Sequence, residues 1–240
     1  MKICKFSTLD STNEYMKNHA ETFEEFDMVI ADSQTHGKAR RGNLWFSDKG
    51  MALFTFLVKK RSEIDHSEYM KLPLLAGMAI IKGLNKFEKL DYKFKWTNDI
   101  YLSEKKLSGI LVEKSGNNFY VGIGININNI LPTKLKNTAI SLSEATGEKY
   151  DITEITVSII EQFQILYNDF INGLWENILS EINSINYLKN RKISIKISDT
   201  FISGIGRDIN SKGEIEILVN NAVLSFSFGE VMNEKILIEK

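Results

Sequence analysis

Residues 98–128 contain three short apolar stretches in succession, separated by only two brief turns. The segment reads NDIYLSEKKLSGILVEKSGNNFYVGIGININ, and turns are predicted at 103–105 and 116–118. Strands joined by such short turns pair as antiparallel neighbours. Because helical patterns occur elsewhere in the chain, this meander predicts an α+β fold in which a mixed sheet packs against helices.

Apolar periodicity and capping residues predict the remaining elements of the first part of the chain. Ser11 with Glu14, and Asp151 with Glu154, have the spacing of a capping box at a helix start. Further strands are predicted at 27–33, 51–59 and 92–96, and helices at about 11–22, 65–89, 140–147 and 151–182.

The sequence changes character after residue 190. Short alternating strands are broken there by Gly, Asn, Asp and Ser, a pattern typical of a small β-barrel or sandwich. We place a domain boundary near residue 186, which divides the 240-residue chain into domains at 1–186 and 187–240.

Composition excludes several classes of function. The formal net charge of −1 creates no overall field for nucleic acid or an anionic membrane, so any cationic function must be local. The single cysteine, Cys4, excludes a disulfide framework and a cysteine-based zinc site. No signal peptide is visible, and the most apolar stretch, 72–81, is too short to cross a bilayer. We expect a cytoplasmic protein.

The loop at 34–50 is the strongest candidate for a ligand-binding segment. Its part at 37–45 contains two glycines, three cations and a tryptophan, namely Gly37, Gly42, Lys38, Arg40, Arg41 and Trp45. Glycine permits positive φ and close approach of the backbone, arginine suits bidentate phosphate contact, and an indole can stack on a base. The combination favours a nucleotide, although a solvated basic loop is equally compatible with this stretch alone. The loop does not match the Walker A pattern.

Two further segments carry weaker signals. Lys106 follows a hairpin turn after Asn98 and Asp99, and it could face the same cleft, where a cation can neutralise charge on a phosphate. A solvated lysine beside the turn is the commoner alternative. The segment GIGININ at 122–128 lacks the third glycine and the following helix of a dinucleotide fingerprint. Its glycines favour backbone approach to a ligand, and Asn126 could bind a base.

Taken in order, these segments resemble the biotin–protein ligases, also called biotin–[acetyl-CoA-carboxylase] ligases. The family motifs appear here as Ser11-Thr12-Asn13, GKARRGNLW, KWTNDIYLSEKKLSGILVE and GIGININ. The resemblance covers roughly residues 7–130, and the β-rich tail fits the SH3-like C-terminal domain of that family. The joint occurrence of the motifs at this separation is specific, whereas each motif alone is weak.

The resemblance implies an ATP-dependent enzyme that forms biotinyl-5′-AMP with Mg²⁺ and transfers biotin to a lysine of a biotin carboxyl carrier protein. Residues 1–186 would be the catalytic biotin- and ATP-binding domain. Implied catalytic residues are Arg40 and Lys106. Implied biotin contacts are Ser11, Thr12, Gln34, Lys38, Lys106 and Gly109. Implied nucleotide contacts are Arg40, Arg41, Trp45 and Asn126. No direct protein ligand for the metal is expected.

The chain departs from the family motifs at Lys38, Ala39 and Thr97, where members carry Arg, Gly and Pro. None of these changes removes an indispensable group, so we expect an active enzyme. Asp99 is open between holding Lys106, orienting the acceptor amine and capping a strand end.

Alternatives remain at this stage. A lipoate–protein ligase or octanoyl transferase of the related fold is the nearest one, and an RNA-binding module or a biotin-sequestering protein are others. Because the chain starts at the first predicted strand, we expect no DNA binding. A homodimer is possible.

Overall fold

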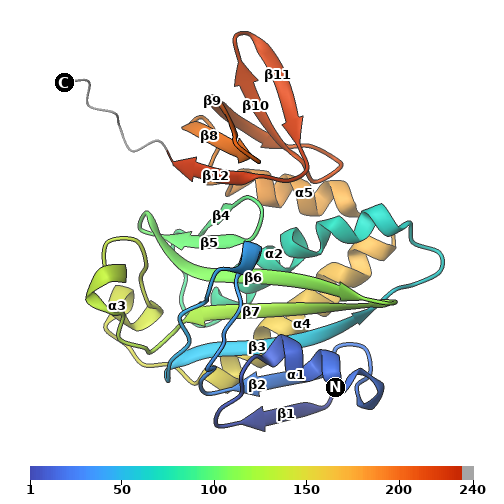
Figure 1. Cartoon of the computed structure of the whole chain (residues 1–240), viewed down its shortest axis with the longest axis vertical. Coiled ribbons are helices and arrows are strands. Elements are labelled where there is room, and N and C mark those ends of the chain that lie inside the picture. Colours follow the sequence, from blue (N-terminus) through green and yellow to red (C-terminus); the bar gives the residue numbers. More distant parts are fainter. Residues whose placement is uncertain (234–240) are drawn as a thin grey trace.

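The structure, a computed structural model, describes residues 1–233. Its larger sheet has seven strands in the order β1-β2-β3-β7-β6-β5-β4 (Figure 1). β1 and β2 pair in parallel, and every other neighbouring pair is antiparallel, so the predicted mixed sheet and its meander are confirmed. The strands are β1 (Ile3–Phe6), β2 (Met28–Ala31), β3 (Met51–Lys59), β4 (Lys93–Lys95), β5 (Asp99–Leu102), β6 (Lys105–Ser115) and β7 (Asn118–Asn126).

The two faces of this sheet are covered differently. The face behind the sheet in Figure 1 packs against α2 (Leu72–Leu84) and α4 (Ile152–Ile171) around the main apolar core, which includes Phe54, Phe56 and Ile123. The other face packs against the short helix α1 (Thr12–Asn18), over a small apolar cluster that includes Leu57 and Tyr120. Part of that face is therefore left for polar side chains and a cavity.

Three predicted helices differ in extent from the observed ones. The first ends at residue 18 and is followed by a 3₁₀ turn at Ala20–Thr22. The second is split into a 3₁₀ segment, His66–Lys71, and α2, because Pro73 fits only the first turn of an α-helix. The third breaks at Gly173, which has φ 81°, into α4 and α5 (Trp175–Ser184).

The other helices are shorter. α3 (Leu142–Thr146) confirms the short helix predicted there, and 3₁₀ turns lie at Arg40–Gly42 and Thr133–Leu135. The Asp151 carboxylate accepts hydrogen bonds from the backbone N–H groups of Thr153 and Glu154, as its capping spacing predicts. Within residues 1–233 no helix is long and apolar enough to cross a bilayer.

A second, antiparallel sheet follows α5, in the order β11-β10-β9-β8-β12 (Figure 1). It confirms a small β unit at the C-terminal end, although the strands form a sheet from β11 to β12 rather than a closed barrel in the part described. The strands are β8 (Lys192–Ile197), β9 (Thr200–Ile209), β10 (Ile215–Val219), β11 (Ala222–Phe226) and β12 (Glu230–Asn233).

Two tryptophans connect the second sheet to the body of the molecule. The Trp96 indole N–H donates to the carbonyl of Gly213 at 3.0 Å, and the Trp175 indole N–H donates to the carbonyl of Ser211 at 2.7 Å. Both indoles are almost fully buried. These contacts hold the second sheet beyond the β4 edge of the first (Figure 1). The segment that leads into β12 completes one wall of a cavity.

Candidate active site

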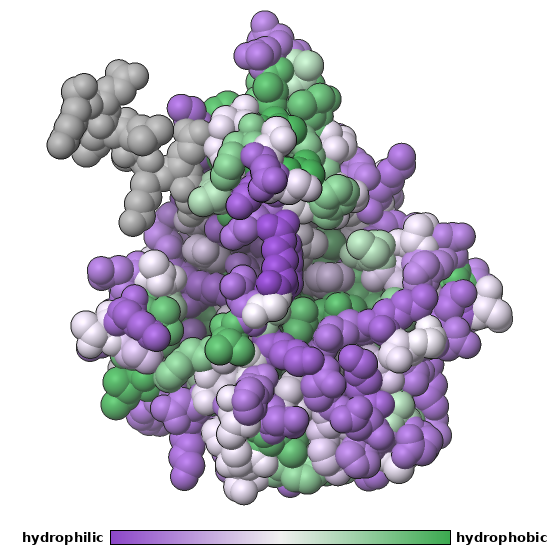
Figure 2. Space-filling view, viewed as in Figure 1, coloured by the Kyte–Doolittle hydropathy of each residue, from purple (hydrophilic) through white to green (hydrophobic). Residues whose placement is uncertain are grey.

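A cavity of about 350 Å³ lies on the α1 face of the large sheet. Its walls come from the start of α1, the loop at 38–45, strands β5 to β7 and residues 229–231. Figure 2, seen from this face, shows hydrophilic residues gathered at the waist between the two sheets. The volume suits a small-molecule site with a few placed polar groups.

The floor of the cavity is bare backbone. Gly109 of β6 pairs with Gly124 of β7, and Gly122 lies two residues further along the same face. The Trp45 indole packs directly on the first pair, since a Cβ at Gly124 would lie 2.4 Å from the indole Nε1 and one at Gly109 would lie 2.8 Å from the ring. The buried indole Nε1 has no hydrogen-bond partner within residues 1–233. A ligand that uses this floor must therefore displace or adjoin Trp45.

Residues 37–45 form a small hairpin that carries Trp45 onto the floor. The Trp45 N–H donates to the carbonyl of Gly37 at 2.8 Å, and the Ala39 N–H donates to that of Asn43 at 2.8 Å. The hairpin thus brings its cations and its indole to the cavity from one short segment.

The two loop glycines serve different purposes. Gly42 has φ 75°, as predicted, and Arg41 beside it also has a positive φ of 59°. For Gly37 the prediction of positive φ is wrong, and what it needs is space, because a Cβ there would lie 2.3 Å from Ser47 Oγ. Ala39 has extended backbone with φ −122°, so alanine replaces the family's glycine without strain.

The end of the cavity beside α1 is polar. Gln34 Oε1 accepts from the backbone N–H of Thr12 at 2.8 Å and from its hydroxyl at 3.1 Å. Gln34 Nε2 donates to Ser47 Oγ at 3.1 Å. Ser11 stands at the N-cap position of α1, but its side chain makes no capping hydrogen bond, so the predicted capping box is wrong. Ser11 lines the cavity instead.

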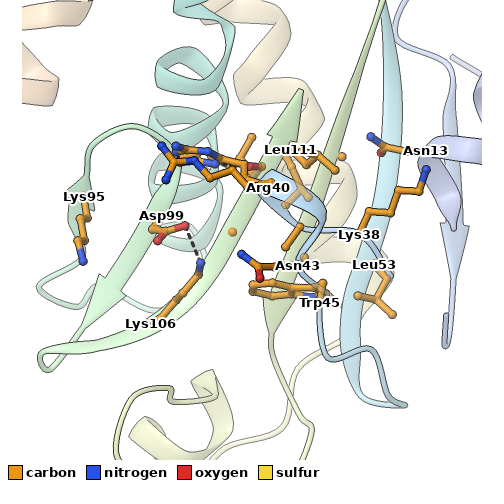
Figure 3. A pocket seen from close by; sticks show the side chains of 18 of the residues that line it. Asn13, Lys38, Arg40, Asn43, Trp45, Leu53, Lys95, Asp99, Lys106 and Leu111 are labelled. Atoms are coloured by element: carbon orange, nitrogen blue, oxygen red, sulfur yellow. Dashed lines mark hydrogen bonds and ion pairs between the residues drawn. The ribbon is translucent and has the colours of Figure 1, made fainter. Parts of the chain in front are cut away.

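The opposite end of the cavity is cationic. Lys106 Nζ lies 2.7 Å from Asp99 Oδ1 and 5.2 Å from the centre of the Trp45 indole (Figure 3). Of the alternatives for Asp99, the structure therefore shows the ion pair with Lys106. Both side chains are partly exposed, which leaves the ammonium accessible from the cavity.

Arg40 is the more buried cation. Its guanidinium donates to Asn98 Oδ1 and, at 2.9 Å, to the carbonyl of Gly229. The Asn98 amide is oriented by its own donation to the carbonyl of Ile110 at 2.7 Å. Burial lowers the pKa of Arg40, and the Asp99 carboxylate opposes that change. A desolvated guanidinium with fixed partners is well suited to bind an anionic oxygen.

Lys95 is a cavity residue that the sequence reasoning did not single out, although it precedes Trp96 in the quoted KWTND motif. Its side chain is 9% exposed, and its ammonium lies 3.2 Å from the Tyr101 hydroxyl. Burial lowers the pKa of Lys95, and the nearby Lys106 acts in the same direction while Asp99 opposes it. Burial also raises the pKa of the Tyr101 hydroxyl.

Nine of the predicted site residues line this one cavity: Ser11, Thr12, Gln34, Lys38, Arg40, Arg41, Trp45, Lys106 and Gly109. Asn126 does not; it is buried one row beyond Gly124, where its Oδ1 accepts from the Asn129 amide at 3.1 Å. The residues that sequence reasoning missed, besides Lys95, include Asn13 and the segment 229–231.

Two of the loop cations already have carboxylate partners. Lys38 Nζ lies 2.5 Å from Glu14 Oε1, and this hydrogen bond raises the pKa of Lys38. Arg41 Nη1 lies 2.8 Å from Glu230 Oε2, at the start of β12, and both of these side chains are exposed. An exposed ion pair of this kind contributes on the order of 0–1 kcal/mol, so it leaves Arg41 free to exchange partners.

Known proteins share the fold and much of the sequence. A bifunctional ligase/repressor BirA of Bacillus subtilis is 34% identical over 186 residues, which cover 71% of this chain and 56% of that protein. The BirA of Escherichia coli K12 is 28% identical over 230 residues, covering 93% of this chain and 71% of its own. The chain thus spans little more than half the length of the Bacillus relative.

A solved structure of the biotin protein ligase from Aquifex aeolicus in complex with biotin and ATP has a TM-score of 0.88. It shares 27% identity and covers 96% of this chain and 97% of its own. The model of the biotin/lipoate A/B protein ligase family matches residues 6–128, just over half of the chain. The chain belongs to the biotin/lipoate A/B protein ligase family.

Proposed function

We propose that the protein is an ATP-dependent biotin–protein ligase, which joins biotin to AMP and then transfers the biotinyl group to a lysine of a biotin carboxyl carrier protein. The observation that carries this proposal is one cavity with a polar end at Thr12 and Gln34, a bare glycine floor, and a cationic end at Arg40 and Lys106. The similarity to a ligase solved with biotin and ATP supports it.

In the first step a carboxylate oxygen of biotin attacks the α-phosphorus of MgATP, and pyrophosphate leaves. Negative charge builds on the oxygens around that phosphorus, so positioned cations lower the barrier. Lys106 and Arg40 are the catalytic residues of this proposal, and Arg41 supports the phosphates from the loop. Mg²⁺ arrives with ATP as part of the substrate, bound through phosphate oxygens.

The polar end would bind the ureido ring of biotin, with Ser11, Thr12 and Gln34 as hydrogen-bonding partners. Backbone around Lys38 would contribute, and Gly109 would leave room for the bicyclic ring. A purely apolar ring or alkyl chain would remove water from this end without offering a hydrogen bond in return, at a cost of about 1–3 kcal/mol for each polar group that loses a partner. This argues for biotin over lipoate or octanoate as the acid.

Ligand binding requires the hairpin 37–45 to rearrange, because Trp45 covers the glycine floor. We expect biotin with MgATP to move the indole onto the adenine side and to order the loop over the reactive anhydride, which excludes water. Saturating ligands should therefore change the fluorescence of Trp45 and slow proteolytic cleavage at Arg40 and Arg41. Phe in place of Trp45 provides the fluorescence baseline. Identical cleavage rates with and without ligands would contradict this closure.

A second prediction concerns Lys95, whose buried ammonium faces the cationic end. Because its pKa is lowered in the folded state, the unfolded chain binds the proton more tightly, and the charge destabilises the fold at neutral pH. This free-energy cost of folding is full at pH values below the pKa of Lys95 in the folded protein. It disappears as the pH rises to the pKa of Lys95 in the unfolded chain. Lys95→Met should therefore raise Tm at pH 7, with a smaller gain near pH 10.

Lys95→Met should also raise the KM for MgATP by about tenfold. In wild type the ammonium of Lys95 attracts the anionic phosphates that enter the same cavity, and the substitution removes that attraction. The KM for biotin should change little. Lys93→Met, which changes a half-buried lysine on the same strand that does not line the cavity, is the matched control. A variant with lower Tm and unchanged kinetics would show that Lys95 is only structural.

In the second step the acceptor lysine amine attacks the carbonyl of the mixed anhydride, and AMP leaves. In this proposal Asp99, the partner of Lys106, would help orient that amine, and Lys106 would follow the charge on the leaving phosphate. Transfer is tested by incubating the protein, biotin and MgATP with a carrier domain and measuring the carrier's mass. Labelling that disappears when the acceptor lysine is changed to Arg supports the proposal, and an unlabelled carrier opposes it.

Two of the proposed partner properties concern association. We propose that the chain does not bind DNA specifically, which gel retention of promoter fragments at moderate salt would test. Homodimer formation is compatible with the proposal. Sedimentation velocity with and without ligands would show whether the protein is a monomer, a dimer or a mixture of the two.

A further inference from the structure

Behind the polar end of the cavity, a chain of hydrogen bonds connects Thr12 to a carboxylate that lies outside the cavity. Glu113 Oε2 accepts from Asn13 Nδ2 at 2.8 Å. Asn13 Oδ1 lies 2.5 Å from Thr55 Oγ1, which lies 2.8 Å from Thr12 Oγ1. Thr12, Asn13 and Thr55 are all less than 5% exposed. Neither Thr55 nor Glu113 lines the cavity.

The strand register places this chain against the glycine floor. Thr55 pairs with Gly122, and Gly122 pairs with Leu111. A Cβ at Gly122 would lie 2.1 Å from Asn13 Oδ1, so the glycine is what allows the amide to reach Thr55. The Asn13 side chain is seen at the α1 side of the cavity in Figure 3.

Proton counting fixes the direction of these hydrogen bonds. An ionised carboxylate only accepts, so Glu113 holds the amino group of Asn13 toward itself and turns the amide oxygen toward Thr55. The Thr55 hydroxyl has one proton and lies near two oxygens, at 2.5 Å from Asn13 Oδ1 and 2.8 Å from Thr12 Oγ1. The proton goes to the amide oxygen, because that oxygen can only accept, whereas Thr12 has a hydroxyl proton of its own. Thr55 can offer only lone pairs to its other neighbour, Thr12.

The remaining neighbour of Thr12 also accepts. Gln34 donates its amide N–H to Ser47, which turns Oε1 toward Thr12. Thr55 and Gln34 thus both accept from the Thr12 hydroxyl, and its one proton is used between them rather than toward the cavity. Thr12 Oγ1 presents only lone pairs to a ligand.

We propose that Glu113, Asn13 and Thr55 are positioning residues that make Thr12 a hydrogen-bond acceptor, and thereby select an acid that carries an N–H donor at this end. The inference rests on the proposed function and deepens it. The ureido ring of biotin has such N–H groups, whereas the dithiolane of lipoate and the chain of octanoate have none. Without the fixed direction, the Thr12 hydroxyl could turn its proton toward the ligand and lose this preference.

The test compares Thr55→Val with Thr156→Val, which removes an equally buried hydroxyl from α4, far from the cavity. Thr55→Val should raise the biotin Kd at least tenfold, with the MgATP KM within twofold of wild type. Thr156→Val should leave both constants unchanged. Tm values of the two variants show whether folding is affected alike.

Glu113 offers a second pair of variants. Glu113→Gln keeps an acceptor oxygen for Asn13 but removes the charge, so the biotin Kd should stay within about threefold of wild type. Glu113→Leu removes the acceptor and lets the Asn13 amide turn over, and it should weaken biotin at least tenfold. The pair separates hydrogen-bond direction from the long-range effect of the charge on Lys38.

Two cyclic carbamate analogues of biotin, each with one ureido N–H replaced by oxygen, test the acceptor directly. Wild type should bind one of them at least tenfold more weakly than biotin, and Thr55→Val should reduce that discrimination at least threefold. The inference would be overturned if Thr55→Val discriminated between biotin and the carbamate analogue as strongly as wild type does. It would also be overturned if Glu113→Gln and Glu113→Leu lost biotin affinity equally. In either case, biotin binding by wild type would still support the proposed function. Wild type that binds no biotin would overturn both.

Discussion

Replacing Lys106 by methionine is expected to slow biotin-dependent pyrophosphate release by about 10²–10³-fold, with little change in Tm. Lys106 Nζ is partly exposed to the cavity and is held by Asp99, so its loss removes charge stabilisation rather than packing. The effect should fall on kcat more than on the KM for either substrate, because the charge it stabilises develops in the transition state.

The neighbouring lysine provides the matched control. Lys105→Met removes a cation one residue away that does not line the cavity, and it should leave the rate within about twofold of wild type. Asp99→Asn should retain much of the activity of wild type, since Lys106 would keep its charge but lose its orientation. Equal rates for Lys106→Met and Lys105→Met would remove Lys106 from the mechanism.

Replacing Arg40 by alanine is expected to lower kcat/KM for MgATP by at least about 10²-fold. The guanidinium is held by Asn98 and the carbonyl of Gly229, and its desolvation lets it gain by pairing with a phosphate. Arg40→Lys should recover only part of the activity, because a lysine keeps the charge but cannot make both contacts with a planar fork.

Arg41→Ala shows whether the effect of Arg40→Ala depends on where Arg40 lies or only on the positive charge of the loop. Arg41 makes an exposed ion pair with Glu230, so its removal should cost no more than about tenfold in the rate. Losses of equal size at Arg40 and Arg41 would mean that the loop contributes general positive charge. In that case the specific placement of Arg40 would not matter.

Most of the fold could be predicted from the sequence because its signals are local. The meander at 98–128 is fixed by its turns, and β3 is apolar at most positions because helices cover both of its faces. The ends of the helices were harder to predict from the sequence. The break at Gly173 and the early end of α1 depend on how each segment packs, and a single glycine does not distinguish a helix interior from a terminus.

The site was predictable where chemistry is concentrated in short motifs. The loop cations, Trp45 and Lys106 meet in one cavity as expected. Lys95 was missed because a lysine in an alternating strand gives no sign that it is buried. The wall at 229–231 was missed because it approaches from the other sheet. Asn126 was predicted to line the cavity but lies one row beyond it, because the sequence does not predict the register between neighbouring strands.

The most direct test of the proposed activity is pyrophosphate release from MgATP in the presence of biotin, lipoate or octanoate, each supplied separately to the purified protein. Release with biotin, and not with the other two acids, is the predicted result. It would link the polar end at Thr12 and the cationic end at Lys106 in one reaction. Release with lipoate alone would contradict the assignment of the acid, and no release with any of the three would contradict an adenylate-forming ligase.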